Sequence, residues 1–189
     1  MAEPKKEPRK NPSIEERLVR ERTIMLFGEI NQKIAREVAE KLVAFDADSD
    51  AEIKIFINSQ GGHVEAGDTI HDMIRFVKAP VKIIGTGWVA SAGALIYAAA
   101  RRENRYSLPN TRFMLHQPSG GVGGQATDIS IEAQEILKMR DRLNKIFAEQ
   151  TGKSVEQIAR DSDRNFWMSA EEARAYGLVG KLIRSATEL

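Results

Sequence analysis

Residues 81–100 place an apolar run, two glycines, a serine and a run of small residues in direct succession, and this order limits the fold more than any other stretch does. Residues 81–84 predict a buried strand, and Gly85 and Gly87 predict a sharp turn after it. Residues 92–100 are small or apolar and predict a closely packed helix. Ser91 is therefore expected at a helix N-terminus, where a serine serves either as a simple N-cap or as a nucleophile beside free backbone N–H groups.

The same succession of strand, turn and helix is repeated along the chain. Strand-like runs lie at 23–27, 53–57, 112–115 and 178–183, and helical patterns lie at 14–21, 31–45, 66–77 and 127–150. We expect the first strand to end at Gly28 and the second at Asn58, because turn-forming residues interrupt the apolar runs there. This alternation is typical of right-handed βαβ units, so the sequence predicts an α/β fold with a largely parallel sheet and a site beyond the carboxyl ends of its strands.

Composition narrows the classes of function. The length of 189 residues favours one domain. The formal net charge of +1 gives no reason to expect a nucleic-acid partner. Because the chain has no cysteine, it has no thiol nucleophile, disulfide or sulfur ligand for zinc. Residues 1–12 are rich in lysine, arginine and proline, and we expect them to form a mobile tail. Because we find no signal-peptide core and no apolar run long enough for a bilayer, we expect a cytoplasmic protein without a membrane partner.

A serine that performs acyl transfer needs a base and N–H donors for the oxyanion. His116 is the best candidate base because it directly follows the strand predicted at 112–115. A histidine at such a position is also compatible with no chemistry at all. Gly61 and Gly62 either bring backbone N–H groups close to a substrate or simply form a turn.

Several motifs carry a resemblance to a known family. They are INSQGGHVEAG from Ile57, GTGWVASAGALI from Gly85, LPNTRFMLHQP from Leu108, GGQATDI from Gly123 and MSAEEARAYGLV from Met168. In the order and spacing of these motifs, residues 14–183 resemble the proteolytic subunits of the Clp protease, the ClpP family (peptidase family S14). The resemblance implies a crotonase-like fold in a domain that covers residues 13–189, with a compact head, a long-helix handle at about 117–152, and neither metal nor cofactor.

The resemblance also assigns roles to residues. It implies that Ser91 is the nucleophile, that His116 is the general base, and that the backbone N–H groups of Gly62 and Ala92 form the oxyanion hole. It further implies a segment that pairs with the backbone of the substrate. This segment consists of Ser119, Gly120, Gly121, Val122, Gly123, Gly124 and Gln125.

The third triad position, an aspartate in the family, falls on Asn165. An asparagine carbonyl accepts the imidazole N–H, but it does not stabilise the imidazolium that forms when the serine loses its proton. We therefore expect weak activity, unless ring alignment restores it or Asp161 or Asp163 reaches His116. The resemblance implies instead that Asp163 and Arg164 pair across a ring interface.

Family members form two stacked seven-membered rings, so the resemblance implies a homo- or hetero-oligomer of this kind. The implied partner is an AAA+ Clp ATPase of the ClpX, ClpA or ClpC type, which feeds unfolded polypeptides to the chamber. Lys54 and Thr86 occupy positions that are usually aromatic or apolar, and Gln60 replaces a usual proline, so docking and the oxyanion turn depart from the family pattern. The docking pocket would be formed by Phe56, Phe76, Ile84, Tyr106, Leu108 and Ile183.

The leading interpretation is a serine endopeptidase that degrades unfolded chains inside a ring chamber. The alternative, motivated by Asn165 and the altered N-terminal tail, is a weakly active or inactive paralogue that serves as a structural or regulatory ring subunit beside an active sibling. An acyl-CoA enzyme on the same fold is disfavoured, because such enzymes need no serine–histidine pair at positions 91 and 116.

Overall fold

The computed structural model describes residues 11–118, 120 and 123–189, and its central feature is a largely parallel sheet. The strands β1 (Thr23–Ile30), β2 (Ile53–Gly62), β3 (Val81–Ala90), β4 (Arg105–Ser107) and β7 (Lys181–Leu182) are neighbours in that order. Outside this order, β5 (Arg112–Leu115) pairs in parallel with the carboxyl-terminal part of β3, beyond the part that pairs with β4. On the other side of β5, β6 (Phe166–Ser169) pairs antiparallel. The α/β fold predicted from the alternating pattern is confirmed.

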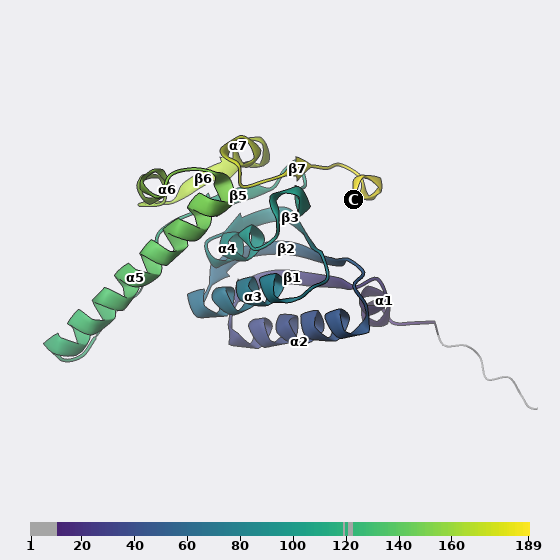
Figure 1. Cartoon of the computed structure of the whole chain (residues 1–189), viewed down its shortest axis with the longest axis horizontal. Helices are drawn as coiled ribbons and strands as arrows, with labels where there is room; N and C mark the ends of the chain where they lie inside the picture. The colour runs from purple at the N-terminus through teal and green to yellow at the C-terminus, as the bar shows by residue number, and fades with distance from the viewer. Residues whose placement is uncertain (1–10, 119, 121–122) are drawn as a thin grey trace, which may run out of the picture.

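The helices form a layer against the sheet and one long arm (Figure 1). They are α1 (Ile14–Arg20), α2 (Gln32–Asp48), α3 (Val64–Phe76), α4 (Ala92–Ala98), α5 (Ala126–Thr151), α6 (Val155–Asp161) and α7 (Ala170–Tyr176), with 3₁₀ helices η1 (Arg102–Asn104) and η2 (Ala186–Glu188). In Figure 1, α2 and α3 lie along one side of the sheet, whereas α5 projects away from the head. The arm agrees with the predicted handle. The domain limits at 13 and 189 stay predictions, and most of the predicted tail lies outside the described residues.

The main core lies between the sheet and the helices packed on it. Every second residue of β2 from Ile53 to Gly61 is buried, because alternate side chains of a strand point to opposite faces. On α2, Val38 and Leu42 are buried at helical spacing and meet this face. Removing apolar surface from water at roughly 25 cal/mol per Å² is the dominant favourable contribution to such a fold.

Three predicted strand limits are wrong. β1 and β2 continue past Gly28 and Asn58, and the register of their ladders shifts at those residues instead of ending. β3 likewise continues past Gly85 and Gly87, so the sharp turn comes only at Ser91. Neighbouring strands keep the backbone groups paired on both sides of each irregularity, which turns an expected end into a bulge.

The closing strand is much shorter than predicted, and two strands were not predicted at all. Only Lys181–Leu182 of the expected run at 178–183 forms a ladder. The strands β4 and β6 have three and four residues, too short to give a periodic signal in the sequence. They are held by neighbours that are distant in the chain.

Two glycines that end helices provide a matched test of backbone constraint. Gly152 after α5 and Gly177 after α7 have φ values of 74° and 100°. A Cβ at Gly177 would overlap the carbonyl of Thr151, while a Cβ at Gly152 would meet nothing within 4 Å. We expect Gly152→Ala to lower the free energy of unfolding by about 1 kcal/mol and Gly177→Ala to lower it by about 2–4 kcal/mol. Denaturant unfolding of the two variants checks this, and equal losses would contradict the packing argument.

Candidate active site

Ser91 lies at the carboxyl end of β3, in the turn that leads into α4. Its φ of 55° and ψ of −123° are unusual for a residue with a side chain, and such strain is held only where the surrounding structure imposes it. The Ser91 N–H donates to the carbonyl of Met114 on β5 at 3.0 Å, which fixes the turn against the neighbouring strand. The Ser91 side chain makes no capping hydrogen bond to α4 in the described chain, so the simple N-cap interpretation is wrong.

His116 directly follows β5, and the parallel pairing of β5 with β3 brings it to Ser91. The His116 Nε2 atom is 2.7 Å from Ser91 Oγ. Burial lowers the pKa of His116 from its ordinary value of 6.5, and a side-chain hydrogen bond with Asn165 partly opposes this shift. The imidazole is therefore neutral at pH 7 and suited to accept the hydroxyl proton of Ser91.

Asn165 reaches the histidine through the antiparallel pairing of β5 with β6. Leu115 on β5 is opposite Phe166 on β6, so the next residues outward, His116 and Asn165, leave the ladder on the same side. The Asn165 side chain lies close enough to the imidazole to oppose the lowering of the His116 pKa. The chain thus brings together the serine, the histidine and the asparagine that the sequence placed in one constellation.

The two aspartates that were candidates for replacing the missing carboxylate have other partners. The Asp161 carboxylate accepts hydrogen bonds from Gln157 at 2.7 Å and from the hydroxyl of Tyr176 at 2.6 Å. The Asp163 carboxylate is 3.4 Å from Gln117 Nε2, which donates at 2.8 Å to the Asp163 carbonyl. Within the residues that the structure describes, neither carboxylate contacts His116. The condition for a rescue by Asp161 or Asp163, contact with His116, is therefore not met among these residues.

Gly61 packs directly against the serine. A Cβ at Gly61 would lie 2.6 Å from Ser91 Cβ, and the residue has a φ of 101°, so this position requires glycine. The Gly61 N–H donates at 3.0 Å to Ser59 Oγ, which in turn donates at 2.6 Å to the Gly28 carbonyl. These positioning roles of Gly61 and Ser59 were not predicted from the sequence, although the pair of adjacent glycines is a signal for close backbone approach.

Gly62 is confined as tightly as Gly61. It has a φ of 149°, and a Cβ there would overlap the carbonyl of Ile30. Ala92 is the first residue of α4, where a backbone N–H has no partner within the helix. The proposed oxyanion role of Gly62 and Ala92 stays a prediction.

A small apolar hollow adjoins the serine and the histidine. Its other lining residues are Val64, Ala92, Leu95, Leu115, Pro118, Leu143 and Phe147. Sequence patterns indicated most of these only as core positions of separate elements, because nothing in a single sequence shows that α3, α4 and α5 meet at one point.

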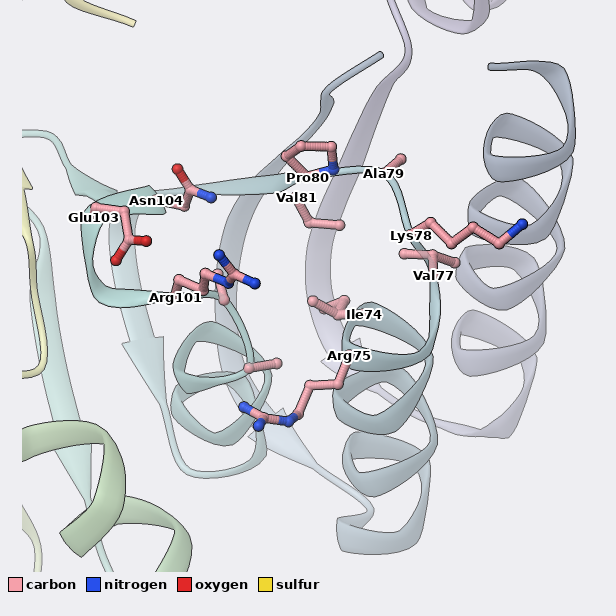
Figure 2. A pocket seen from close by; sticks show the side chains of 12 residues that line it. Ile74, Arg75, Val77, Lys78, Ala79, Pro80, Val81, Arg101, Glu103 and Asn104 are labelled. Atoms are coloured by element: carbon pink, nitrogen blue, oxygen red, sulfur yellow. The ribbon is translucent and has the colours of Figure 1, made fainter. Parts of the chain in front are cut away.

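A second hollow lies far from this chemistry. It has a volume of about 390 Å³ and lies between the ends of α3 and α4, with Arg75 and Arg101 beside it (Figure 2). Val81 at the start of β3 lines it, whereas Ser91 follows the end of β3, roughly 30 Å away along a ten-residue strand. This hollow is not part of the candidate active site.

The remaining predicted site residues divide into three groups. Ser119, Gly121 and Val122 lie outside the described residues, and Gly120, Gly123, Gly124 and Gln125 have no regular structure. Five of the six predicted docking residues gather in one cluster, and Phe76 is apart from them on α3 with 77% of its surface exposed. The cluster contains Phe56, Ile84, Tyr106, Leu108 and Ile183.

Over the described residues, no group of three or more histidine or acidic side chains is arranged to hold a metal ion. Among the same residues, no helix is both long and apolar enough to cross a membrane.

The lowered pKa of His116 predicts a pH profile for the reactivity of Ser91. A neutral imidazole activates the serine, and protonation removes this activation, so reactivity is present above the lowered pKa and is lost as the pH falls through it. We expect labelling of Ser91 by a fluorophosphonate probe to have its midpoint below pH 6.5, with no labelling of Ser91→Ala. A midpoint above pH 6.5 would contradict the assignment of burial as the dominant influence.

Comparison with known proteins identifies the family to which this chain belongs. A family model described as Clp protease matches residues 5–186. The chain is 64% identical over 178 residues to the ATP-dependent Clp protease proteolytic subunit 2 of Gluconobacter oxydans (strain 621H), covering 93% of this chain and 80% of that one. Its structure resembles that of ClpP1 from Listeria monocytogenes with a TM-score of 0.85 and 54% identity, covering 94% and 99% of the two chains. The structure of an N165D mutant of ClpP1 from the same organism matches with a TM-score of 0.85 and 55% identity, covering 90% and 96%. The serine–histidine pair at the end of β3 and β5 is thus found in a chain that belongs to the Clp protease family of serine peptidases.

Proposed function

We propose that this chain is a ring subunit of a Clp-type serine endopeptidase, in which Ser91 is the nucleophile and His116 is the general base. The observation that carries the proposal is the 2.7 Å contact between His116 Nε2 and Ser91 Oγ at a strained turn. The same contact disfavours an acyl-CoA enzyme, which has no need of this pair.

The chemistry follows from these positions. His116 accepts the Ser91 proton while Oγ attacks the carbonyl carbon of the peptide bond. The backbone N–H groups of Gly62 and Ala92 then donate to the oxyanion. Next, the protonated His116 gives its proton to the leaving amine, and water releases the acyl group in a second step that uses the same base.

Asn165 limits the rate of this reaction at the step where His116 becomes positively charged. Its amide orients the imidazole but carries no charge to stabilise the imidazolium. Burial of His116 acts in the same direction, because it disfavours the charged form. Low turnover by the isolated chain is the consequence.

A second candidate function is favoured by the neutral residue Asn165 at the third triad position. With a neutral third residue, and with Asp161 and Asp163 bonded to other groups, the chain is suited to serve as a weakly active subunit that completes a ring with an active sibling. In this function its contribution is to assembly, docking or regulation of the sibling.

The proposed assembly is two stacked heptameric rings with the sites inside, located in the cytoplasm. The projecting α5 supports a handle between rings (Figure 1). The Arg164 side chain is 93% exposed and only 4.0 Å from Asp163 at its nearest, which leaves it available for a pair across that interface. An AAA+ Clp ATPase would supply unfolded polypeptides, and residues 119–125 would pair with their backbones.

Asn165→Asp provides the decisive test of the limiting step. We expect kcat for peptide hydrolysis by the purified oligomer to rise by between about 10-fold and 10⁴-fold, with a smaller change in KM. The added carboxylate stabilises the imidazolium, so the midpoint of the pH profile is also expected to shift upward. An unchanged kcat would show that the third residue does not limit turnover.

Matched variants separate the two candidate functions. Asn104→Asp adds the same charge near the start of β4, remote from Ser91, and is expected to leave kcat unchanged. Ser91→Ala abolishes any gain in the Asn165→Asp background if Ser91 is the nucleophile. Mixing the chain with an active Clp proteolytic subunit tests the second function, since activation that persists with Ser91→Ala in this chain shows a structural or regulatory contribution.

A further inference from the structure

The outer face of the sheet carries a small apolar cluster that the chain itself covers. Ile84, Tyr106 and Ile183 on or beside β3, β4 and β7 form its buried centre, separate from the main core. Leu189 packs against this centre, although it is distant in sequence from both β3 and β4. Phe56 and Leu108 also pack against the centre, which is almost inaccessible, with exposed fractions of 0% for Ile84, 9% for Tyr106 and 2% for Ile183.

A specific set of polar contacts holds the covering segment, residues 184–189, in this place. Lys82 Nζ on β3 donates to a main-chain oxygen of Leu189 at 2.6 Å and forms an ion pair with Glu52 at 2.9 Å. The Lys82 ammonium also lies 5.8 Å from the centre of the Tyr106 ring. Lys82 is only 15% exposed, so its side chain is fixed in a defined geometry rather than free in solvent.

The covering segment is folded and not merely draped over the sheet. Its 3₁₀ helix η2 has Ser185 as the N-cap of a capping box, in which the Glu188 carboxylate accepts from the Ser185 N–H at 2.9 Å. The same carboxylate accepts from the Arg184 N–H at 2.7 Å, and Lys181 Nζ donates to the Glu188 carbonyl at 3.3 Å. These bonds turn the chain back from β7, the edge strand, so that Leu189 reaches β3.

We propose that residues 184–189 act as an intramolecular ligand of this cluster, and that a partner which docks there must first displace Leu189. The cluster and Lys82 together recognise an aliphatic side chain and a main-chain oxygen, which is the chemistry of a short peptide segment with an exposed Leu or Ile. The identity of that partner as a Clp ATPase rests on the proposed function. The self-covered state does not, because every contact in it is within the chain.

The first experiment measures the covering contact by itself, in the assembled protein. Leu189→Asp places a charge on the cluster and is expected to release the segment, which raises the fluorescence of the apolar dye ANS and speeds amide hydrogen exchange at 184–189. Val43→Asp makes the same change at a half-exposed position of α2 and is expected to do neither. Lys82→Met, which removes the hydrogen bond but keeps the aliphatic stem, should speed the exchange. Rapid exchange of these amides in the unmodified chain, together with no dye response in Leu189→Asp, would overturn the proposal.

The second experiment measures competition with a partner. Immobilised oligomer is titrated with a Clp ATPase in the presence of a non-hydrolysable ATP analogue. Leu189→Ala and deletion of 185–189 are each expected to tighten binding of the ATPase by about three- to tenfold. This factor corresponds to the loss of one partly buried leucine that competes for the site. Equal affinities for all variants would show that no displacement is needed and would also overturn the proposal. If no ATPase binds any variant while dye binding and exchange behave as expected, the intramolecular ligand stands and the docking partner of the proposed function fails.

Discussion

The parallel pairing of β3 with β5 is the interaction on which the site depends. Ala90 is opposite Met114 at the end of this ladder, so the two strands end at the same edge, and the residues that follow them meet there. The pairing of β3 with β5 is anchored by packing against α4, because Phe113 of β5 is fully buried and the centre of its ring lies 5.1 Å from that of Tyr97 in α4. A parallel ladder buried in this way cannot slip by one residue without moving its apolar side chains to the wrong face.

The strain at Ser91 is stored by the same packing. A non-glycine residue in such a conformation costs of order 1–3 kcal/mol. All seven residues of α4 are buried, and Gly61 is in close contact with the serine from the β2 side, so the turn has no room to relax. Burial of α4 offsets the strain and holds the hydroxyl in reach of His116.

The same sheet carries two features that bear on function: a neutral residue beside His116 at the carboxyl end of its strands, and a covered apolar cluster on its outer face. At the carboxyl end, β6 places the neutral Asn165 beside His116, and Asp161 and Asp163 are bonded to other groups. On the outer face, the chain covers its own apolar cluster through Leu189 and Lys82. β3 carries Lys82 near its start and leads to Ser91 after its end, so the covered cluster and the candidate active site lie along one strand.

The sequence by itself determined the fold class, the approximate limits of helices such as the one predicted at 14–21, and the candidates Ser91, His116 and Asn165. These depend on local periodicity, capping and motif spacing, which are written in short stretches of chain. Tertiary structure alone decided that β6 pairs with β5, that Asp161 is bonded to Tyr176, and that Leu189 returns to β3. Each of these is a contact between residues that are distant in sequence, and the free energy that selects it comes from packing of the whole domain rather than from the pattern of any one segment.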